Sequence, residues 1–476
     1  MRGVLGVDGD SKRGNFATRE DRHLPEIAAL LDPRQFELIS KPDAGLVVIQ
    51  GGAGSGKTTI GVHRLALLAY RAKHRFTPDR MLVIVGSPAL RAYISEVLPA
   101  LGLRGLPVLT FVEWARDARR RAIPWLEAPI EENTPSDVTR YKTHPAMLRL
   151  IEQRAAEVAL DPRARRDSRG VVALWAEVLT NRDRALAAFA EAADPEMGPE
   201  QVHRAWKWCA DRCPAVVDLD PGERAEREAA ENDESDSEKL GADRSEIGGD
   251  ERATLDEEDD ALLLRAHQLL RGDLAQRKKG ASIEHLFVDE AQDLAPIDLS
   301  VLLGVVSPAA TGERSLNTKS VTLAGDTSQR LHMDSGFRDW RDVLDHLGLS
   351  RVEIEPLRIA YRSTREVLAF ARDVLGPLAD PTPPIANRSG APVEHHHFPS
   401  PGAAVGFLAD ALRPLFAHEP RATVAILARH PEQADVYFEA LQMAEIPHLR
   451  RVAHYEFSFR PGVEVTEIRQ VKGLEF

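Results

Sequence analysis

The chain has 476 residues, of which 43% are hydrophobic and 28% are charged, and its formal net charge is −13 at pH 7. This length predicts two to four domains, and the composition is that of an ordinary soluble protein. Two cysteines give no disulfide framework, and no apolar run is long enough to span a membrane. The first twenty residues contain no apolar signal segment, so we expect a cytoplasmic protein.

The acidic excess is concentrated in one segment. Residues 218–260 carry 19 acidic and 5 basic side chains, which leaves the rest of the chain at about +1. The body of the protein is therefore compatible with a nucleic-acid partner. We interpret residues 221–254 as a solvated, largely disordered insertion, because their composition cannot bury a core. A partner-binding role for this acidic tract is the open alternative.

In chain order, the first strong signal is a glycine-rich loop. Residues 46–49 are an apolar run that predicts a buried parallel strand, and residues 51–58 read Gly-Gly-Ala-Gly-Ser-Gly-Lys-Thr. Residues 60–72 then show the apolar periodicity of a helix. A strand, a glycine loop and a helix in this order are the context of a P-loop. Its N–H groups converge on phosphate, helped by the positive end of the helix dipole.

We expect this loop to bind ATP or another nucleoside triphosphate together with Mg²⁺. Lys57 supplies a mobile positive charge to the β- and γ-phosphates, and Thr58 supplies a hydroxyl to the metal ion. The nucleotide-binding residues predicted from the loop are Gly51, Gly52, Ala53, Gly54, Ser55, Gly56, Lys57, Thr58 and Thr59.

A second apolar strand ends in carboxylates. Residues 283–293 read Ile-Glu-His-Leu-Phe-Val-Asp-Glu-Ala-Gln-Asp, and an exposed acidic patch fits poorly with the apolar residues before the acids. Parallel sheets deliver such side chains to a site beyond the carboxyl ends of their strands. We predict that Asp289 holds Mg²⁺ through water, and that Glu290 orients and deprotonates the attacking water.

With both elements placed, the order of the motifs resembles that of superfamily 1 DNA helicases of the UvrD/Rep type, and within them the helicase-IV/HelD-like branch. The resemblance covers residues 32–476, apart from much of 111–254. It implies an α/β fold: a P-loop NTPase with two RecA-like parallel-sheet domains, the second incomplete, and a helical insertion in the first. It also implies Mg²⁺-dependent ATP hydrolysis coupled to movement along single-stranded DNA, with RNA as an alternative.

Three segments in the first half resemble motifs of this family. Leu-Asp-Pro-Arg-Gln35 is similar to the Q motif, which implies that Gln35 reads the adenine edge. A strand that leads to Ser87 and Pro88 resembles motif Ia, and one that leads to Thr110 and Phe111 resembles motif Ib. Both imply contacts with the single strand, although the family more often has Thr-Phe-Thr-Asn-Lys in motif Ia.

The second half resembles motifs III, IV and V. Gln329 then senses the γ-phosphate, Tyr361 stacks on adenine, Arg362 reaches the γ-phosphate across the domain cleft, and Glu475 lies near the ribose. The catalytic residues implied in all are Lys57, Asp289, Glu290, Gln329 and Arg362. The family usually has a base-stacking tryptophan soon after motif III. Here Phe337 and Trp340 follow further on, and a core role is favoured for both over stacking.

Residues 24–110 and 283–350 are expected to form the first RecA-like domain, behind an N-terminal extension at 1–23. Its helical insertion would comprise residues 111–282, and the second RecA-like domain residues 351–476. These boundaries place the ATP between the two RecA-like domains, so that closure of the cleft moves one domain against the other.

The sequence departs from UvrD-type unwinding enzymes in two ways. Only a short segment separates residue 447 from motif V, so the large duplex-engaging insertion is expected to be absent, as in the HelD-like branch, some of whose members act on RNA polymerase. The sequence also stops within motif V, before the arginine-bearing motif VI. We therefore keep two alternatives open: an ATPase that remodels RNA polymerase complexes, and a truncated nucleotide-binding fragment with little activity alone.

Two clusters invite interpretation as metal sites. The spacing of Cys209 and Cys213 alone does not specify a metal. The run His395-His-His397 lies between proline-rich turns and a strand-like segment without a nearby cysteine, which favours a solvent-exposed strand edge. Mg²⁺ at the predicted P-loop site, held by Thr58 and Asp289, is the metal that we predict.

Overall fold

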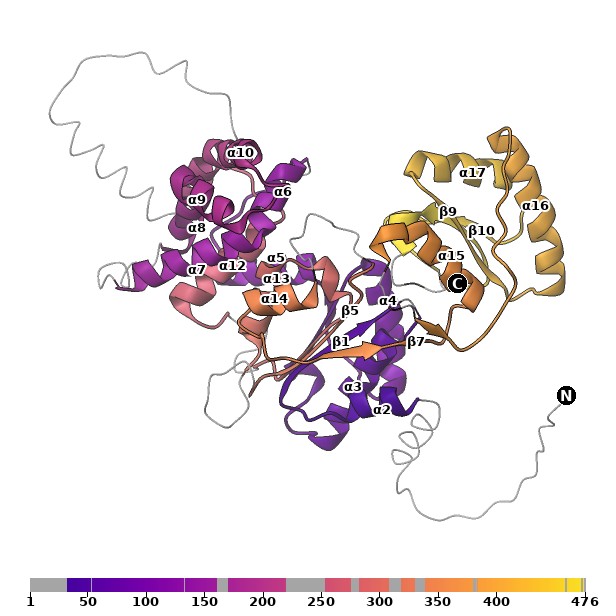
Figure 1. Ribbon diagram of the computed structural model, residues 1–476, viewed down its shortest axis with the longest axis horizontal. Helices are drawn as coiled ribbons and strands as arrows, with labels where there is room; N and C mark the ends of the chain where they lie inside the picture. Colours follow the sequence, from indigo (N-terminus) through magenta and orange to yellow (C-terminus); the bar gives the residue numbers. More distant parts are fainter. Residues whose placement is uncertain are drawn as a thin grey trace, which may run out of the picture.

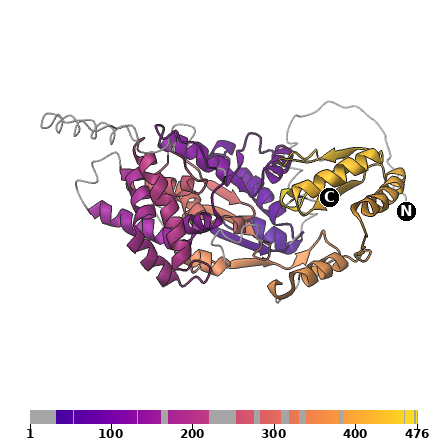
Figure 2. The same cartoon turned by 90° about the horizontal axis from the view of Figure 1, so that it is seen from above.

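The computed structural model describes residues 32–52, 54–131, 133–160, 170–219, 253–274, 282–307, 318–329, 339–379, 382, 384–458, 460–471 and 474. Within this part of the chain, a large parallel sheet lies between a cluster of helices on one side and a smaller α/β unit on the other (Figures 1 and 2). The predicted α/β class is confirmed.

The larger sheet has six parallel strands in the order β3-β2-β4-β5-β1-β6. A parallel sheet covered on both faces needs strands that are apolar almost throughout, which explains runs such as Met-Leu-Val-Ile-Val in β2. The strands are β1 (Gly45–Gly51), β2 (Met81–Val85), β3 (Val108–Thr110), β4 (His285–Val288), β5 (Ser320–Gly325) and β6 (Ile354–Leu357).

Helices cover both faces of this sheet. Val47 and Ile49 of β1 point into one core, and Val48 between them points into the other. The first core includes α2 (Pro33–Ser40), α3 (Lys57–Arg71) and α4 (Pro88–Val97). The second includes α5 (Phe111–Ala122), α12 (Asp259–Arg271), α13 (Pro296–Val305) and α14 (Trp340–His346).

The strand register brings distant segments to one edge of the sheet. Gln50 at the end of β1 pairs with Gly325 at the end of β5, and Val288 of β4 pairs with Leu323. The P-loop, the residues after Val288 and the residues after Gly325 therefore all leave the sheet at its carboxyl edge, where ligands of open parallel sheets bind.

The helices beside the second face have their own hydrophobic core, with Trp175 at 2% exposure. The helices are α6 (Ser136–Thr143), α7 (Pro145–Leu160), α8 (Gly170–Thr180), α9 (Arg182–Ala192) and α10 (Pro199–Val217). Cys209 and Cys213 are buried in α10. Residues 220–252, with most of the predicted disordered segment, lie outside the described residues.

The smaller unit contains a three-stranded parallel sheet, β10-β11-β9. Its elements are β9 (Thr423–Ala428), β10 (Leu449–Arg451), β11 (Gly462–Glu467), α16 (Pro401–His418) and α17 (Pro431–Met443).

A connecting region joins the two sheets. It contains β7 (Ile359–Ala360), which pairs with β8 (Ile385–Ala386), and α15 (Arg365–Leu375). β6 lies before it and pairs with β1, so residues 354–357 belong to the larger sheet, although we expected the second domain to begin at 351. β6 extends this sheet beyond β1 and is itself the edge strand.

Short 3₁₀ turns complete the described elements: η1 (Pro78–Arg80), η2 (Leu98–Leu101), η4 (Ala291–Asp293), η6 (Gly376–Leu378) and η7 (Ile468–Val471). No helix in the described ranges is both long and apolar enough to cross a membrane. The His395–His397 run is exposed, and the described part of the chain holds no group of three or more His, Cys, Asp or Glu arranged for a metal ion.

Candidate nucleotide-binding site

The glycine loop between β1 and α3 has the backbone that the sequence predicts. Gly54 and Gly56 have φ of 69° and 87°, a region that residues with a Cβ rarely adopt. A Cβ on Gly56 would also lie 2.7 Å from Gln35 Nε2. Both glycines are thus required by conformation or space. Ala53 lies outside the described residues.

Lys57 is the first residue of α3 and is largely buried. Its Nζ donates to the carbonyl oxygens of Gly51, at 2.7 Å, and Gly52, at 3.3 Å. The ammonium group is therefore held over the loop, at the end of the helix where the dipole is positive. This combination favours the binding of an anion such as a phosphate.

Thr58 and Asp289 connect the glycine loop to the carboxylates that follow β4. Thr58 Oγ1 donates to Asp289 Oδ2 at 2.6 Å. Asp289 is 1% exposed, and burial, together with the neighbouring Glu290 carboxylate, raises the pKa of Asp289 to about 7. A hydroxyl beside a carboxylate is a hard-oxygen pair that suits Mg²⁺, which usually takes few protein ligands and completes its shell with phosphate and water.

Glu290 occupies an unusual backbone position. Its φ is 54°, in the left-handed region, which is uncommon for a residue other than glycine and typical of functional sites. The side chain is 6% exposed, and its Oε2 accepts from Gln292 Nε2 at 2.5 Å. Next to it, a Cβ on Gly86 would lie 2.9 Å from Glu290 Cβ, so Gly86 leaves room for this turn.

Gln35 lies against the P-loop, as the Q-motif resemblance implies. Its Nε2 donates to Ser55 O at 3.3 Å, and its Oε1 accepts from Asp32 N at 3.3 Å. Asp32 in turn caps α2, because its carboxylate accepts from Arg34 N at 2.7 Å. The structure thus places the Gln35 amide at the loop; its contact with adenine stays a prediction.

Tyr361 and Arg362 are brought to the other side of the loop. Tyr361 N donates to Gly54 O at 2.9 Å. Arg362 lines a cavity of about 180 Å³ together with Thr58 and Tyr93. Burial lowers the pKa of Arg362, an effect that Tyr93 and Asp289 oppose, and burial followed by the Asp32 carboxylate raises the pKa of the Tyr361 hydroxyl.

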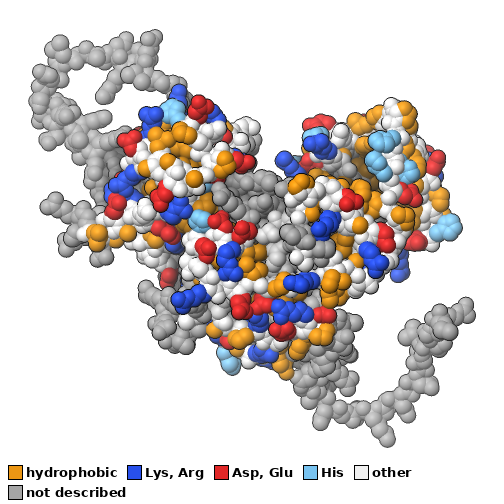
Figure 3. All heavy atoms as spheres, in the orientation of Figure 1, with side chains coloured by type: hydrophobic (Ala, Val, Ile, Leu, Met, Phe, Trp, Pro, Cys, Tyr) orange, Lys and Arg blue, Asp and Glu red, His pale blue; other side chains and the backbone are white. Residues whose placement is uncertain are grey.

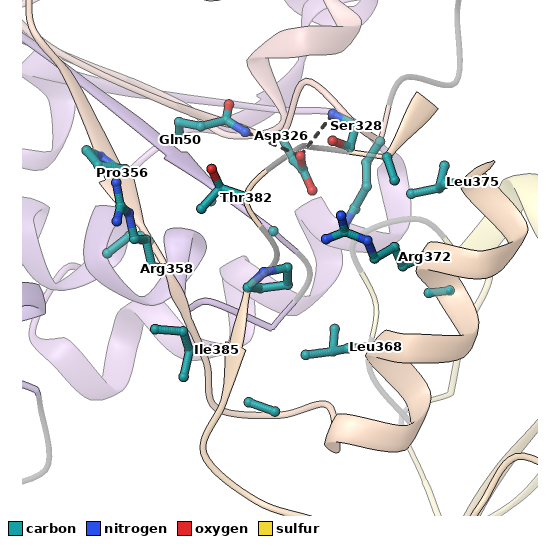
Figure 4. A pocket seen from close by; sticks show the side chains of 18 of the residues that line it. Gln50, Asp326, Ser328, Pro356, Arg358, Leu368, Arg372, Leu375, Thr382 and Ile385 are labelled. Carbon is teal, nitrogen blue, oxygen red and sulfur yellow. Dashed lines mark hydrogen bonds between the residues drawn. The ribbon is translucent and has the colours of Figure 1, made fainter. Parts of the chain in front are cut away.

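Gln329 follows β5 on the third side of the site, where its N donates to Asp326 O at 3.0 Å. Both residues line a cavity of about 700 Å³, which also includes Gly51 and Gly52. Figure 4 shows Asp326 and Ser328 at the top of this cavity, between Pro356 and Arg358 on one side and the α15 side chains Leu368 and Arg372 on the other. The cavity extends from the P-loop to the connecting region that contains α15 and β8.

Trp340 has the core role that we favoured. It is 2% exposed, and its Nε1 donates to Gln50 Oε1 at 2.5 Å. Gln50 Nε2 also lies 3.4 Å from Asp326 Oδ1. The indole therefore fixes the residue just before the glycine loop. Phe337 lies outside the described residues, as does Glu475, the residue predicted near the ribose.

The residues predicted to contact single-stranded nucleic acid lie at the starts of two helices, α4 and α5. Ser87 Oγ accepts from Leu90 N at 3.2 Å and Pro88 begins α4, while Thr110 caps α5, which begins at Phe111. Their contacts with nucleic acid stay predictions. On the face shown in Figure 3, basic and acidic side chains of the described residues are interspersed, and no broad basic field marks a nucleic-acid path.

Sequence reasoning missed three side chains of this site. Gln50 and Gln292 hydrogen bond to it, and Tyr93 lines the Arg362 cavity. Both glutamines had a local signal, since one directly precedes the glycine loop and the other lies two residues after Glu290. Tyr93 had none, because its distance from Arg362 is set by the packing of α4.

Comparison with known proteins agrees with this arrangement. Residues 31–333 match the model of the UvrD/REP helicase N-terminal domain. The chain is 27% identical over 443 residues to proteins named ATP-dependent DNA helicase UvrD2 from Mycobacterium bovis and from two strains of Mycobacterium tuberculosis. Each alignment covers 89% of this chain and 55% of the relative, so the chain spans about half the length of the curated relatives it matches.

Proposed function

We propose, since the chain belongs to the UvrD/Rep helicase family, that it acts as an ATP-dependent DNA helicase or translocase. It would couple ATP hydrolysis to movement on single-stranded DNA. The observation that supports this proposal most is the 2.6 Å contact between Thr58 and Asp289, which are 231 positions apart. It unites the glycine loop with the carboxylates at one sheet edge, as a P-loop ATPase requires.

The proposed roles follow from these positions. Lys57 and the loop N–H groups bind the β- and γ-phosphates, and Thr58 and Asp289 would hold Mg²⁺. The ion would supply positive charge to the phosphate oxygens during transfer. Glu290 accepts the proton of the attacking water, because it is the buried carboxylate next to the metal ligand.

The remaining predicted residues come from outside the loop. Gln35 and Tyr361 hold adenine from two sides of the loop, and Gln329 contacts the γ-phosphate. Arg362 offsets charge on that phosphate, and it is contributed by the connecting region rather than by the larger sheet. ATP therefore bridges two parts of the chain, and its hydrolysis changes how they are held together.

The experiment that tests the proposal is ATP hydrolysis by the full 476-residue chain, measured with single-stranded DNA, with single-stranded RNA, and without nucleic acid. We expect Mg²⁺-dependent turnover that single-stranded DNA stimulates. Lys57→Ala is the control, and it should lose ATP binding because the loop alone cannot neutralise the phosphates. No Mg²⁺-dependent turnover in any condition, or unchanged ATP affinity in Lys57→Ala, would refute the proposal.

A further inference from the structure

The side-chain amide of Gln292 connects three parts of the site. Gln292 is 0% exposed. Its Nε2 donates to Glu290 Oε2 at 2.5 Å and lies 3.4 Å from Gln329 O, and its Oε1 accepts from Asp326 N at 2.9 Å. One amide thus bridges the carboxylate after β4 and the backbone of the loop after β5.

The end of β5 leaves space for this amide. A Cβ on Gly325 would lie 2.5 Å from Gln292 Oε1 and 2.9 Å from Trp340 Cζ2. Real Cβ atoms do not make contacts this short, so the bridge to Asp326 N depends on glycine at position 325. Glycine at position 325 therefore leaves space for the Gln292 amide, which a residue with a Cβ would exclude.

The two ends of the amide do different things. Satisfying the buried Asp326 N–H requires an acceptor only. The donor end is directed at the Glu290 carboxylate, and Gln292 is the one side chain found to donate to it within the described ranges. A buried carboxylate that accepts a hydrogen bond from a fixed donor has a fixed direction, which a general base needs.

We infer that Gln292 is a positioning residue for Glu290, which it links to the loop at residues 326–329. The inference rests on the proposed function, since it takes Glu290 as the base. When the loop moves, the amide moves with Asp326 N and Gln329 O, and the carboxylate moves with the amide. Hydrolysis is then fast only when the loop that contains Gln329 is in place.

Gln292→Glu tests this bridge with almost no change in shape. The new side chain still accepts from Asp326 N, but in its ionised form it presents an oxygen instead of a donor to Glu290. We expect kcat for ATP to fall by roughly 10²-fold, the scale of a misplaced catalytic group, with KM and nucleotide affinity within about twofold of wild type. A purely structural role would lower thermal stability without this split between kcat and KM.

The matched control is Gln268→Glu in α12, where Gln268 Nε2 donates to Val301 O at 2.9 Å. It makes the same substitution at a partly buried amide away from the site and should keep wild-type kcat. Equal losses in both variants would attribute the effect to the new carboxylate itself and overturn the inference.

Gly325→Ala gives an independent route, because its methyl group displaces the Gln292 amide. It should lower kcat in the wild-type background and have a smaller effect in a Gln292→Ala background, where the contact with Trp340 Cζ2 remains but the amide is gone. Additive losses would show that Gly325 acts through something other than Gln292 and would overturn the bridge. Rates are measured by single turnover of bound ATP, so that slow variants are quantified.

The outcomes separate the two proposals. If the wild-type chain turns over ATP and Gln292→Glu keeps the wild-type kcat, with or without a raised KM, the inference is overturned and the proposed function stands. Absence of ATP turnover in the wild-type chain overturns the proposed function and the inference together. A fall in kcat with retained nucleotide binding, absent in Gln268→Glu, supports the positioning role.

Discussion

Two regions of the molecule bury a pair of carboxylates, and they treat the charge differently. In the helical insertion, Lys142 Nζ lies 2.5 Å from Asp256 and 2.7 Å from Asp259. At the sheet edge, the hydrogen bonds to Asp289 and Glu290 come from a hydroxyl, a backbone N–H and a neutral amide. The first pair has its own cation, and the second is held by neutral donors.

The acidities follow this division only in part. In the insertion, burial works against ionisation; the Lys142 ammonium and hydrogen bonds hold the pKa of Asp256 below its usual value, whereas burial raises the pKa of Asp259 although Lys142 opposes it. At the sheet edge, burial and Glu290 raise the pKa of Asp289 to about 7, although Lys57 opposes them. The pair in the insertion has a local counter-charge, because Lys142 contacts both carboxylates. A pair held by neutral donors keeps a negative charge that Mg²⁺ can offset.

The largest expected effect on stability is in the insertion. Lys142→Met should lower the free energy of unfolding by about 3–5 kcal/mol, because it leaves two buried carboxylates without their cation. Denaturant unfolding measures this loss. Lys207→Met, at an exposed lysine of α10, is the control and should change it little. If Lys142→Met unfolds at the wild-type denaturant concentration, this cluster does not stabilise the fold.

The same logic predicts the opposite result at the sheet edge. Asp289→Asn should lose Mg²⁺-dependent ATP binding while the fold becomes no less stable. Because the folded-state pKa of Asp289 is raised, its cost to stability grows as the pH rises from about 4 to about 7 and is full above that. The melting temperature of the variant relative to wild type should thus be higher at pH 8 than at pH 5. A variant that is less stable at both pH values would contradict the comparison.

His285, the first residue of β4, is a further buried titratable group. It is 0% exposed, its Nδ1 lies 2.8 Å from Ser320 Oγ, and burial, with Arg64 and Arg75, lowers its pKa well below the usual value. The unfolded chain binds the proton more tightly, so stability should fall by about 1.4 kcal/mol per pH unit below roughly 6.5. His285→Asn should remove this slope in thermal melts recorded between pH 5 and 8. An unchanged slope would show that other groups cause it.

The smallest expected effect concerns the position of α2. Arg34 contacts Glu355 Oε2 at 2.5 Å, and Lys41 also pairs with Glu355, so β6 holds the helix that contains Gln35. Glu355→Gln should raise the KM for ATP roughly fivefold, equivalent to ~1 kcal/mol for a partly exposed ion-pair cluster, at unchanged kcat. Glu353→Gln, at an exposed neighbour, is the control. Equal KM values in the two variants would show that the ion pairs between α2 and Glu355 do not affect nucleotide binding.

The parts that could be predicted are those whose chemistry is local in sequence. The glycine loop, its flanking strand and helix, and the strand before Asp289 each depend on neighbouring residues, and the structure has all of them. The parallel order of the strands then brings Thr58 to Asp289 without further information.

The rest depends on contacts between distant elements. Asp256 and Asp259 belong by charge count to the acidic segment, yet both are almost fully buried because Lys142 lies opposite them. The observed α12 is buried on most sides at its start, because it packs between the sheet and the insertion. No periodicity in one sequence shows such a partner.

We propose above all that the carboxylates at the sheet edge serve ATP hydrolysis. Glu290→Gln tests it most directly, through parallel measurements of ATP affinity and single-turnover hydrolysis in the full chain. We expect wild-type affinity for Mg²⁺-ATP and a loss of turnover of roughly 10²–10⁴-fold, because the amide can orient water but cannot accept its proton. Hydrolysis by Glu290→Gln at the wild-type rate would contradict it.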